Sequence, residues 1–432
     1  MKRLALIFVW FIPAISFAAY TNSYTNTNTY TNTNTYTNTN TYTNTQTNTY
    51  TYNYTQTCTY TYNGVQYDCY TGSPVQGESG LIPISQACPE RQLDPSYGEN
   101  CNYRVPVGTR YTAVKIKHWY GGAGFNENEP FVQAGGLDNN DKVVGQARTS
   151  SGELHAVSSS LGPYGENMYF TDLGVSDSNS SARAITDNQV AIGTNQNSST
   201  GRDEAVWWYS SGAPESLGMN AFIQSQGLAY ARNSWYEEFV AGHGTLASDN
   251  KNHGFVRCPT CSYAQTRIIG SNGQENYALS INDDKVAVGY FNKYGIDQAY
   301  YATGTGIIEL PDLGGAARAL DVNNNVHEIM VGYARDSYAQ HAVFWKDNVL
   351  KKLPALPYKN NSSATAVADG GDIVGESGGR AVIWQEQKIT DLNKLVDNKT
   401  SVTFTTAIDI NWPGRILVKG NNGHFYILRP IL

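Results

Sequence analysis

A unit of about 45 residues, present seven times before the C-terminus, constrains the fold more than any other feature of the sequence. Each copy contains a short apolar run that ends in glycine, and successive glycines lie 48, 49, 47, 43, 43 and 45 residues apart. These glycines are Gly145, Gly193, Gly242, Gly289, Gly332, Gly375 and Gly420. Self-similarity at such a period indicates a repeat architecture in which each unit buries its apolar surface against its neighbours.

Two further patterns hold fixed places within the unit. A few residues before each glycine, an apolar segment closes on Asn or Asp, as in Ile281-Asn282-Asp283. After the glycine, a polar residue precedes a small residue and an apolar strand, as in His341-Ala342-Val343-Phe344. Asn and Asp between short apolar segments are typical of tight hairpins. Each unit therefore predicts four short antiparallel strands, which is one blade of a β-propeller.

The two ends of the repeat array complement each other. The seventh unit ends at Leu432 after its third strand, and a spare strand over Tyr111–Trp119 precedes the first unit. Pairing the spare strand with the last unit would close the ring and remove the exposed sheet edges. We therefore predict an all-β fold, a seven-bladed β-propeller over residues 107–432 that is closed by an N-terminal strand.

These units resemble the extracellular repeat of the HAF family, with its Ala-x-x-Ile-Asn, Gly-x-x-x-Gly and His-Ala-Phe patterns. The best matches are Ile281-Asn282-Asp283 with Val288-Gly289, and His341-Ala342-Val343-Phe344-Trp345, whereas Tyr230-Ala231-Arg232-Asn233 departs from the pattern. The resemblance covers residues 110–432 and implies a secreted bacterial β-propeller-like protein. It implies no activity, and no catalytic residue is carried over from it.

The first 18 residues are typical of a secretory signal peptide. Lys2 and Arg3 precede an apolar run from Leu4 to Phe17, and Ser16-Phe17-Ala18 fits a cleavage site. The run is shorter than the roughly 20 apolar residues that a membrane-spanning helix needs. We expect a mature chain that does not span a membrane and is secreted, displayed on the cell surface or kept in the periplasm.

Residues 19–57 form a low-complexity tract of Thr, Asn and Tyr, with Thr at every odd position from Thr25 to Thr51. A period of two is incompatible with a helix, and without apolar residues to bury the composition favours an extended or disordered stalk. Two alternatives remain open for residues 20–57. Uncharged Asn and Tyr segments can stack into cross-β ladders and so self-associate, and the Thr array is similar to ice-binding surfaces but lacks Gly or Pro for turns.

An oxidising compartment favours disulfides for the six cysteines. Four of them lie in a neck over residues 58–106, where local pairing is the simplest of three possible connectivities. For the last two, in Cys258-Pro-Thr-Cys261, we favour a loop disulfide over a zinc or redox site, because no second pair of ligands accompanies them. The predicted disulfide cysteines are Cys58, Cys69, Cys88, Cys101, Cys258 and Cys261.

Several function classes are excluded or disfavoured. The chain has 30 Lys and Arg against 37 Asp and Glu without a basic cluster, which argues against binding to nucleic acid. Residues 375–379 match the GxSxG pattern of serine hydrolases but lie between two predicted strands, which indicates a hairpin. Four units place His155, His253, His341 and His424 where the others have Glu204, Gln298 and Arg380. This variation favours hydrogen bonding to the neighbouring strand's backbone over a metal site, so we predict no metal, cofactor or catalytic residue.

The aromatic residues suggest where a ligand would bind. We expect Trp207, Trp345 and Trp384 to pack between blades. Aromatic side chains near the ends of predicted strands would lie on a loop face that binds sugars or peptides; they are Trp119, Tyr120, Trp235 and Tyr236. The sequence thus predicts a secreted or surface-displayed, non-enzymatic recognition protein for an extracellular glycan or protein. The alternative is a propeller enzyme that acts on extracellular polysaccharide through carboxylates in its central channel.

Overall fold

A computed structural model gives the architecture of the chain. It describes residues 59–62, 65–68, 105–116, 131–161, 168–174, 178–186, 189–209, 213–233, 236–261, 265–271, 273–324, 328–397 and 401–431. The chain divides into two units, Met1–Glu90 and Arg91–Leu432. In the first unit, β1 (Thr59–Tyr62) and β2 (Val65–Asp68) form an antiparallel hairpin. The predicted signal peptide, the Thr/Asn/Tyr tract and the four neck cysteines lie outside the described residues.

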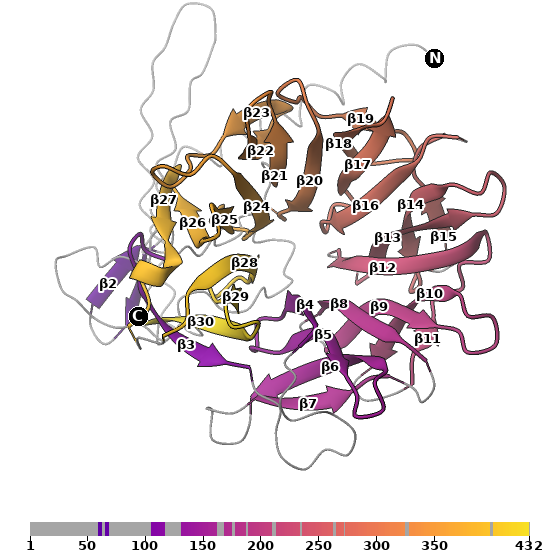
Figure 1. Ribbon diagram of the computed structural model, residues 1–432, viewed down its shortest axis with the longest axis horizontal. Coiled ribbons are helices and arrows are strands. Elements are labelled where there is room, and N and C mark those ends of the chain that lie inside the picture. The colour runs from indigo at the N-terminus through magenta and orange to yellow at the C-terminus, as the bar shows by residue number, and fades with distance from the viewer. Residues whose placement is uncertain are drawn as a thin grey trace, which may run out of the picture. The chain divides into compact units, whose positions relative to one another are not determined.

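The second unit is a ring of seven four-stranded antiparallel sheets (Figure 1). From the innermost strand outward, blades 1 to 3 are β4 (Gln133–Leu137), β5 (Val143–Arg148), β6 (Leu154–Leu161), β7 (Met168–Asp172); β8 (Ser180–Ile185), β9 (Val190–Gln196), β10 (Asp203–Tyr209), β11 (Glu215–Ser216); and β12 (Phe222–Arg232), β13 (Glu238–Leu246), β14 (Asn252–Cys258), β15 (Gln265–Ile268).

Blades 4 to 7 are β16 (Asn276–Ile281), β17 (Ala287–Lys293), β18 (Ile296–Ala302), β19 (Ile308–Glu309); β20 (Ala317–Val322), β21 (Ile329–Arg335), β22 (Gln340–Lys346), β23 (Val349–Lys352); β24 (Ser362–Val367), β25 (Ile373–Ser377), β26 (Ala381–Gln385), β27 (Lys388–Asp391); and β28 (Phe404–Ile410), β29 (Ile416–Gly420), β30 (Phe425–Ile431), β3 (Arg110–Lys115). A 3₁₀ turn over Leu392–Lys394 follows β27. The predicted seven-bladed all-β propeller is confirmed.

The closure of the ring is also confirmed. Strand β3 pairs antiparallel with β30, with Tyr111 opposite Pro430 and Lys115 opposite Tyr426. The N-terminal strand is therefore the outermost strand of blade 7. The interface between blades 7 and 1 is apolar, because Leu417 and Ile427 pack in one cluster with Val157.

An apolar cluster of this kind lies at every interface between successive blades. Trp207, Trp345 and Trp384 belong to three of these clusters, as the sequence predicted. The indole N–H groups of Trp345 and Trp384 each donate to a proline carbonyl in the connection that precedes their blade, at 2.7 Å in both cases. These bonds satisfy polar groups that burial would otherwise leave unpaired.

The recurring glycine of the second strand is required by the strand beside it. A Cβ atom on Gly289 would lie 1.9 Å from the carbonyl oxygen of Tyr277 in β16, and equivalent backbone contacts of 2.0 Å occur at Gly193, Gly332 and Gly375. No side chain fits at such a distance. The first strand approaches closely here because it contains a β-bulge, and this bulge also shapes the centre of the ring.

Candidate functional site

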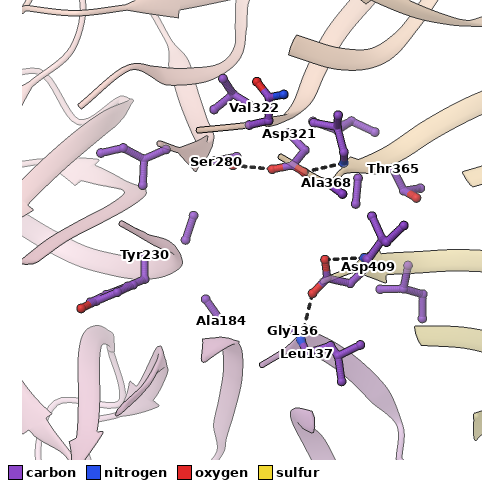
Figure 2. Close-up of a pocket in the computed structure, with 18 of the residues that line it drawn as sticks. Gly136, Leu137, Ala184, Tyr230, Ser280, Asp321, Val322, Thr365, Ala368 and Asp409 are labelled. Carbon is purple, nitrogen blue, oxygen red and sulfur yellow. Dashed lines mark hydrogen bonds between the residues drawn. The ribbon is translucent and has the colours of Figure 1, made fainter. Parts of the chain in front are cut away.

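The innermost strands of all seven blades line a central cavity of about 390 Å³ (Figure 2). Every one of these strands shifts its register against the second strand at the same place. The residue skipped by each shift has no partner in the sheet and lines the cavity. In blade order these residues are Gly135 with Gly136, Arg183, Leu228, Leu279, Leu320, Thr365 and Ile408. The bulges therefore convert one repeat position into a belt around the cavity.

The belt is largely apolar and carries a single charge, that of Arg183. The residues that the structure describes make no hydrogen bond or ion pair with its guanidinium, and burial lowers the pKa of the group. An arginine nevertheless stays protonated at any physiological pH. Its charge, after the larger effect of burial, helps to lower the pKa of His243 in the next blade to about 4. Arg183 is thus the single cation among the residues that line the cavity, and its guanidinium makes no ion pair within the described residues.

Three carboxylates also line the cavity, those of Asp321, Asp369 and Asp409, and hydrogen bonds between blades engage each of them. Figure 2 shows Asp321 and Asp409. Asp321 in blade 5 accepts from the Ser280 hydroxyl of blade 4 at 2.7 Å and from the Val367 N–H of blade 6 at 2.9 Å. Asp409 in blade 7 accepts from the Leu137 N–H of blade 1 at 2.8 Å, and from the N–H that follows it. Both residues therefore tie neighbouring blades together.

The partly buried positions of Asp321 and Asp409 disfavour the charged form of each carboxyl group. Each side chain keeps part of its surface open to the cavity, but protein surrounds the rest. Burial raises the pKa of Asp321 to about 7, and the charge of Asp409 adds to the shift. Burial also raises the pKa of Asp409, against the opposing effect of its two backbone N–H donors.

Asn and Asp side chains link four pairs of neighbouring blades on the end face, which we define as the face where the first strand of each blade ends. The Arg232 N–H donates to Asp283, the Asp283 N–H to Asn324, and the Asn324 N–H to Asp369, each bond leading to the next blade. In the same way, the Trp412 N–H of blade 7 donates to the Asn139 side chain of blade 1. The Asx residues that close the first strand therefore join blades as well as form turns.

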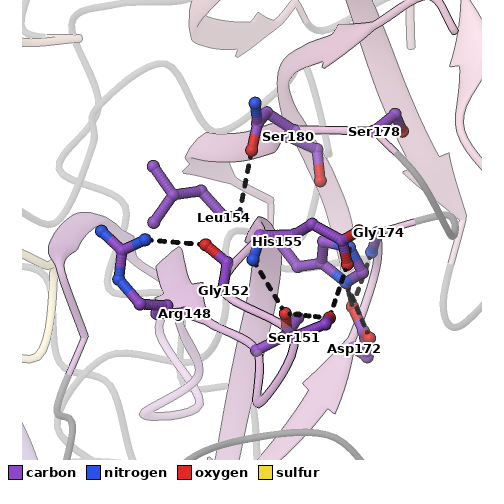
Figure 3. A network of polar contacts seen from close by, with 12 residues as sticks. Arg148, Ser151, Gly152, Leu154, His155, Asp172, Gly174, Ser178 and Ser180 are labelled. Carbon is purple, nitrogen blue, oxygen red and sulfur yellow. Dashed lines mark hydrogen bonds and ion pairs between the residues drawn. The ribbon is translucent and has the colours of Figure 1, made fainter.

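Three of the four histidines at the start of the third strand pair with carboxylates of their own blade, whereas for His424 the backbone N–H donates to the Asn422 side chain at 3.2 Å. His155 bonds to Asp172 at 3.0 Å (Figure 3), His253 to Asp249 at 2.8 Å and His341 to Asp336 at 2.8 Å. The predicted partner, the backbone of a neighbouring strand, is therefore wrong. Among the described residues, no group of three His, Cys, Asp or Glu side chains is placed to hold a metal ion.

The structure places little of the predicted aromatic site. Trp119, Tyr120 and Trp235 lie outside the described residues. Tyr236 is 55% exposed in the turn between β12 and β13 on the end face, and the Arg232 guanidinium covers its ring at 4.6 Å. Of the four residues, Tyr236 alone lies in the part of the chain that the structure describes.

Two other motifs take the form that the sequence predicted. Ser377 of the GxSxG match is buried and accepts from the Leu356 N–H, and Gly378 and Gly379 form the turn of a hairpin. Cys258 and Cys261 form a disulfide. The described residues also include no helix that is long and apolar enough to cross a membrane.

The residues of the belt were not identified from the sequence. Their signal is positional, because each follows the small residue that faces the recurring glycine, as in Ala182-Arg183 and Ala278-Leu279. Aligning the seven units on that small residue would have isolated the belt and its single charge. The alternation of apolar residues alone does not reveal a bulge.

Comparison with known proteins identifies no family. No protein-family model matches the chain. No curated protein matches it either. Among solved structures, TolB from Acinetobacter baumannii is 10% identical with a TM-score of 0.35 over 67% of this chain and 63% of TolB.

Two other solved structures are similar at the same level. The β-propeller domain of the Trilobed protease from Pyrococcus furiosus is 8% identical with a TM-score of 0.40, over 70% of this chain and 94% of that domain. The polysaccharide lyase Uly1 is 9% identical with a TM-score of 0.40, over 74% and 97% of the two chains. Such similarity says nothing about activity.

Proposed function

We propose that this protein is a secreted or surface-displayed recognition protein without enzymatic activity, whose propeller binds an acidic extracellular ligand in its central cavity. The observation that carries this proposal is Arg183, the single cation among the residues that line the cavity, whose guanidinium makes no ion pair within the described residues. The HAF-like repeats and the predicted signal peptide support the location.

The ligand class follows from the chemistry of the belt. A guanidinium binds carboxylates and phosphates through paired N–H donors, and a largely apolar wall strengthens that attraction. A cavity of about 390 Å³ suits a small molecule or the end of a chain. We therefore propose a carboxylate-bearing ligand, such as a uronic acid or the acidic end of a glycan.

A polysaccharide-active enzyme is the rival function, and one observation favours it. Asp321 lies in the cavity with a pKa of about 7, as a general acid requires. However, the Asp321 and Asp409 carboxylates accept hydrogen bonds from neighbouring blades. Moving either group toward a substrate would break contacts between blades, so we assign both a structural role.

Binding and turnover distinguish the two functions. Titration calorimetry with glucuronic acid, N-acetylneuraminic acid and glucose should show binding of the acids only, and R183Q should weaken it tenfold or more. The matched control is R202Q, which removes an exposed arginine from the turn between β9 and β10. Equal affinity of R183Q and wild type, or no binding of any acid, would refute the cavity proposal. Release of fragments from an acidic polysaccharide, lost in D321N, would establish the enzyme instead.

A further inference from the structure

Three tyrosines on one face of the propeller are almost fully exposed to solvent. The exposed fractions of Tyr294, Tyr338 and Tyr358 are 95%, 95% and 103%. Tyr294 lies in the turn between β17 and β18, Tyr338 between β21 and β22, and Tyr358 in the connection from β23 to β24. Turns from second to third strands and connections to the next blade all lie on the start face, where each innermost strand begins. All three tyrosines therefore lie on the start face, in turns and a connection of blades 4 to 6, which are neighbours in the ring (Figure 1).

Two of these tyrosines occupy backbone conformations that favour glycine. Tyr294 has a φ of 54° in a two-residue hairpin, where Asn or Gly is usual. Tyr358 has a φ of 63° after Pro357, in a turn closed by the Lys359 N–H and the Leu356 carbonyl at 3.1 Å. A bulky residue in the left-handed region is strained, although Tyr236 and several polar turn residues of the described chain adopt the same conformation.

The turns that carry the tyrosines are fixed by hydrogen bonds. Asp336 accepts from the N–H groups of Tyr338 and Ala339 at 2.9 and 3.0 Å, and its other oxygen binds His341 and Lys352. These donors hold the pKa of Asp336 well below its usual range. The side chain of Asn292 closes the Tyr294 turn in the same way, by accepting from the Gly295 N–H at 3.0 Å.

The neighbouring turns are also joined to each other. Asn361, just after Tyr358, accepts from the Gln340 N–H through its side chain at 3.1 Å and from the Gly378 N–H through its carbonyl at 2.9 Å. The rings thus extend from turns whose backbones are already ordered. A binding surface of this kind loses little conformational entropy when a ligand arrives.

We propose that Tyr294, Tyr338 and Tyr358 form a binding surface for a neutral polysaccharide chain. A pyranose ring offers a face of C–H groups, which packs against an aromatic ring, and a rim of hydroxyls, which bond to phenol and amide groups. Three rings on separate turns suit an extended chain better than a single sugar. A protein partner would require a contiguous apolar centre, whereas these rings stand apart among polar turns.

The charges nearby favour a neutral chain over an acidic one. Lys293, beside Tyr294, pairs with Glu309 at 2.8 Å, and Lys352 pairs with Asp336 of the Tyr338 turn at 3.0 Å. These two lysines are therefore neutralised by carboxylates within the protein, whereas Lys359, beside Tyr358, is exposed and makes no ion pair among the described residues. The proposed surface does not include Arg183 or the central cavity, so the two proposals can be tested independently.

The test uses the purified mature chain and the triple variant Y294G/Y338A/Y358G. The probes are cellulose, chitin, curdlan and mannan as neutral polysaccharides, with alginate as an acidic one, and binding isotherms measure affinity. We expect wild type to bind at least one neutral polysaccharide and the triple variant to bind it at least tenfold more weakly. Thermal unfolding should show no loss of stability, because glycine relieves the positive φ at two of the positions.

The matched control is Y236G, which changes a tyrosine with a φ of 63° on the opposite face and should leave binding unchanged. Three outcomes would overturn the proposal. The first is that wild type binds none of the neutral polysaccharides, and the second is that the triple variant binds as tightly as wild type. The third is that the substitutions change only the sedimentation of the protein, in which case the surface contacts a second copy of the chain.

Discussion

Asp321 should make the propeller less stable as the pH rises, and D321N should remove this effect. The folded-state pKa is about 7, against 3.8 for an unperturbed carboxyl. Between these values the folded state keeps a proton that the unfolded state has lost, so the stabilisation is complete below the lower value and lost as the pH rises through the upper one. At about 1.4 kcal/mol per pH unit, stability should fall by about 3 kcal/mol between pH 5 and pH 8.

The partners of Asp321 explain why an amide should be tolerated. The protonated carboxyl can donate to the Ser280 hydroxyl, which rotates to accept, while its other oxygen still accepts from the Val367 N–H. An asparagine reproduces this arrangement at every pH. The advantage of D321N over wild type in the free energy of unfolding should therefore grow by about 3 kcal/mol between pH 5 and pH 8.

The equivalent substitution at Asp409 should destabilise the protein, in contrast to D321N. Both of its partners are backbone N–H groups, those of Leu137 and Ile410, and neither can become an acceptor. In D409N, one of these N–H groups faces the NH₂ group of the asparagine. We therefore expect D409N to lower the free energy of unfolding by about 1–3 kcal/mol at both pH 5 and pH 8.

Urea unfolding followed by tryptophan fluorescence at pH 5, 6, 7 and 8 measures these differences. A gap between D321N and wild type that stays constant with pH would refute the argument, because it would mean that Asp321 does not titrate in this range. Equal behaviour of D321N and D409N would show that the identity of the hydrogen-bond donors is unimportant.

Three other outcomes are expected from the way the ring is held together. Y111A removes a fully buried ring of the closing strand and should cost about 3–5 kcal/mol in urea unfolding; a loss below 1 kcal/mol would mean that the strand does not close the ring. C258A/C261A opens a loop of only four residues and should lower stability by about 2 kcal/mol, and thermal unfolding with and without reductant checks the value. W345F and W384F should each lose about 1–3 kcal/mol, because each leaves a proline carbonyl unpaired, and a large difference between them would contradict the equivalence of the two blades.

The sequence predicted the ring because its repeated residues meet backbone requirements. The carbonyl of Tyr277 leaves no room for a side chain at Gly289, and Asn282 closes its turn by accepting from the Val286 N–H. Residues that are fixed by the backbone recur in most blades at a similar spacing, although Val418 stands at the place of the glycine in blade 7. The fold, the blade count and the closing strand followed from that spacing.

The candidate sites could not be predicted in the same way. Leu279 reads as a core residue, since hydrophobic alternation does not distinguish a bulged position from a paired one. The partner of His341 is a carboxylate because the turn before it brings Asp336 within 2.8 Å. The pattern of apolar residues in the strands does not predict the geometry of such a turn. Tyr294 looks like an ordinary loop residue until the two-residue hairpin is seen to impose a positive φ.

The seven copies therefore separate two kinds of position within one chain. Positions with the same residue in most blades, such as the recurring glycine and the turn Asx, hold the blades together. The bulged residue and the tips of the start-face turns make no ladder bond, so they change from blade to blade without disturbing the sheet. Arg183 and Tyr294 both lie at such positions, where their copies in other blades hold different residues. In this propeller, the repeats specify the ring, and the two binding sites that we propose lie at departures from the repeat.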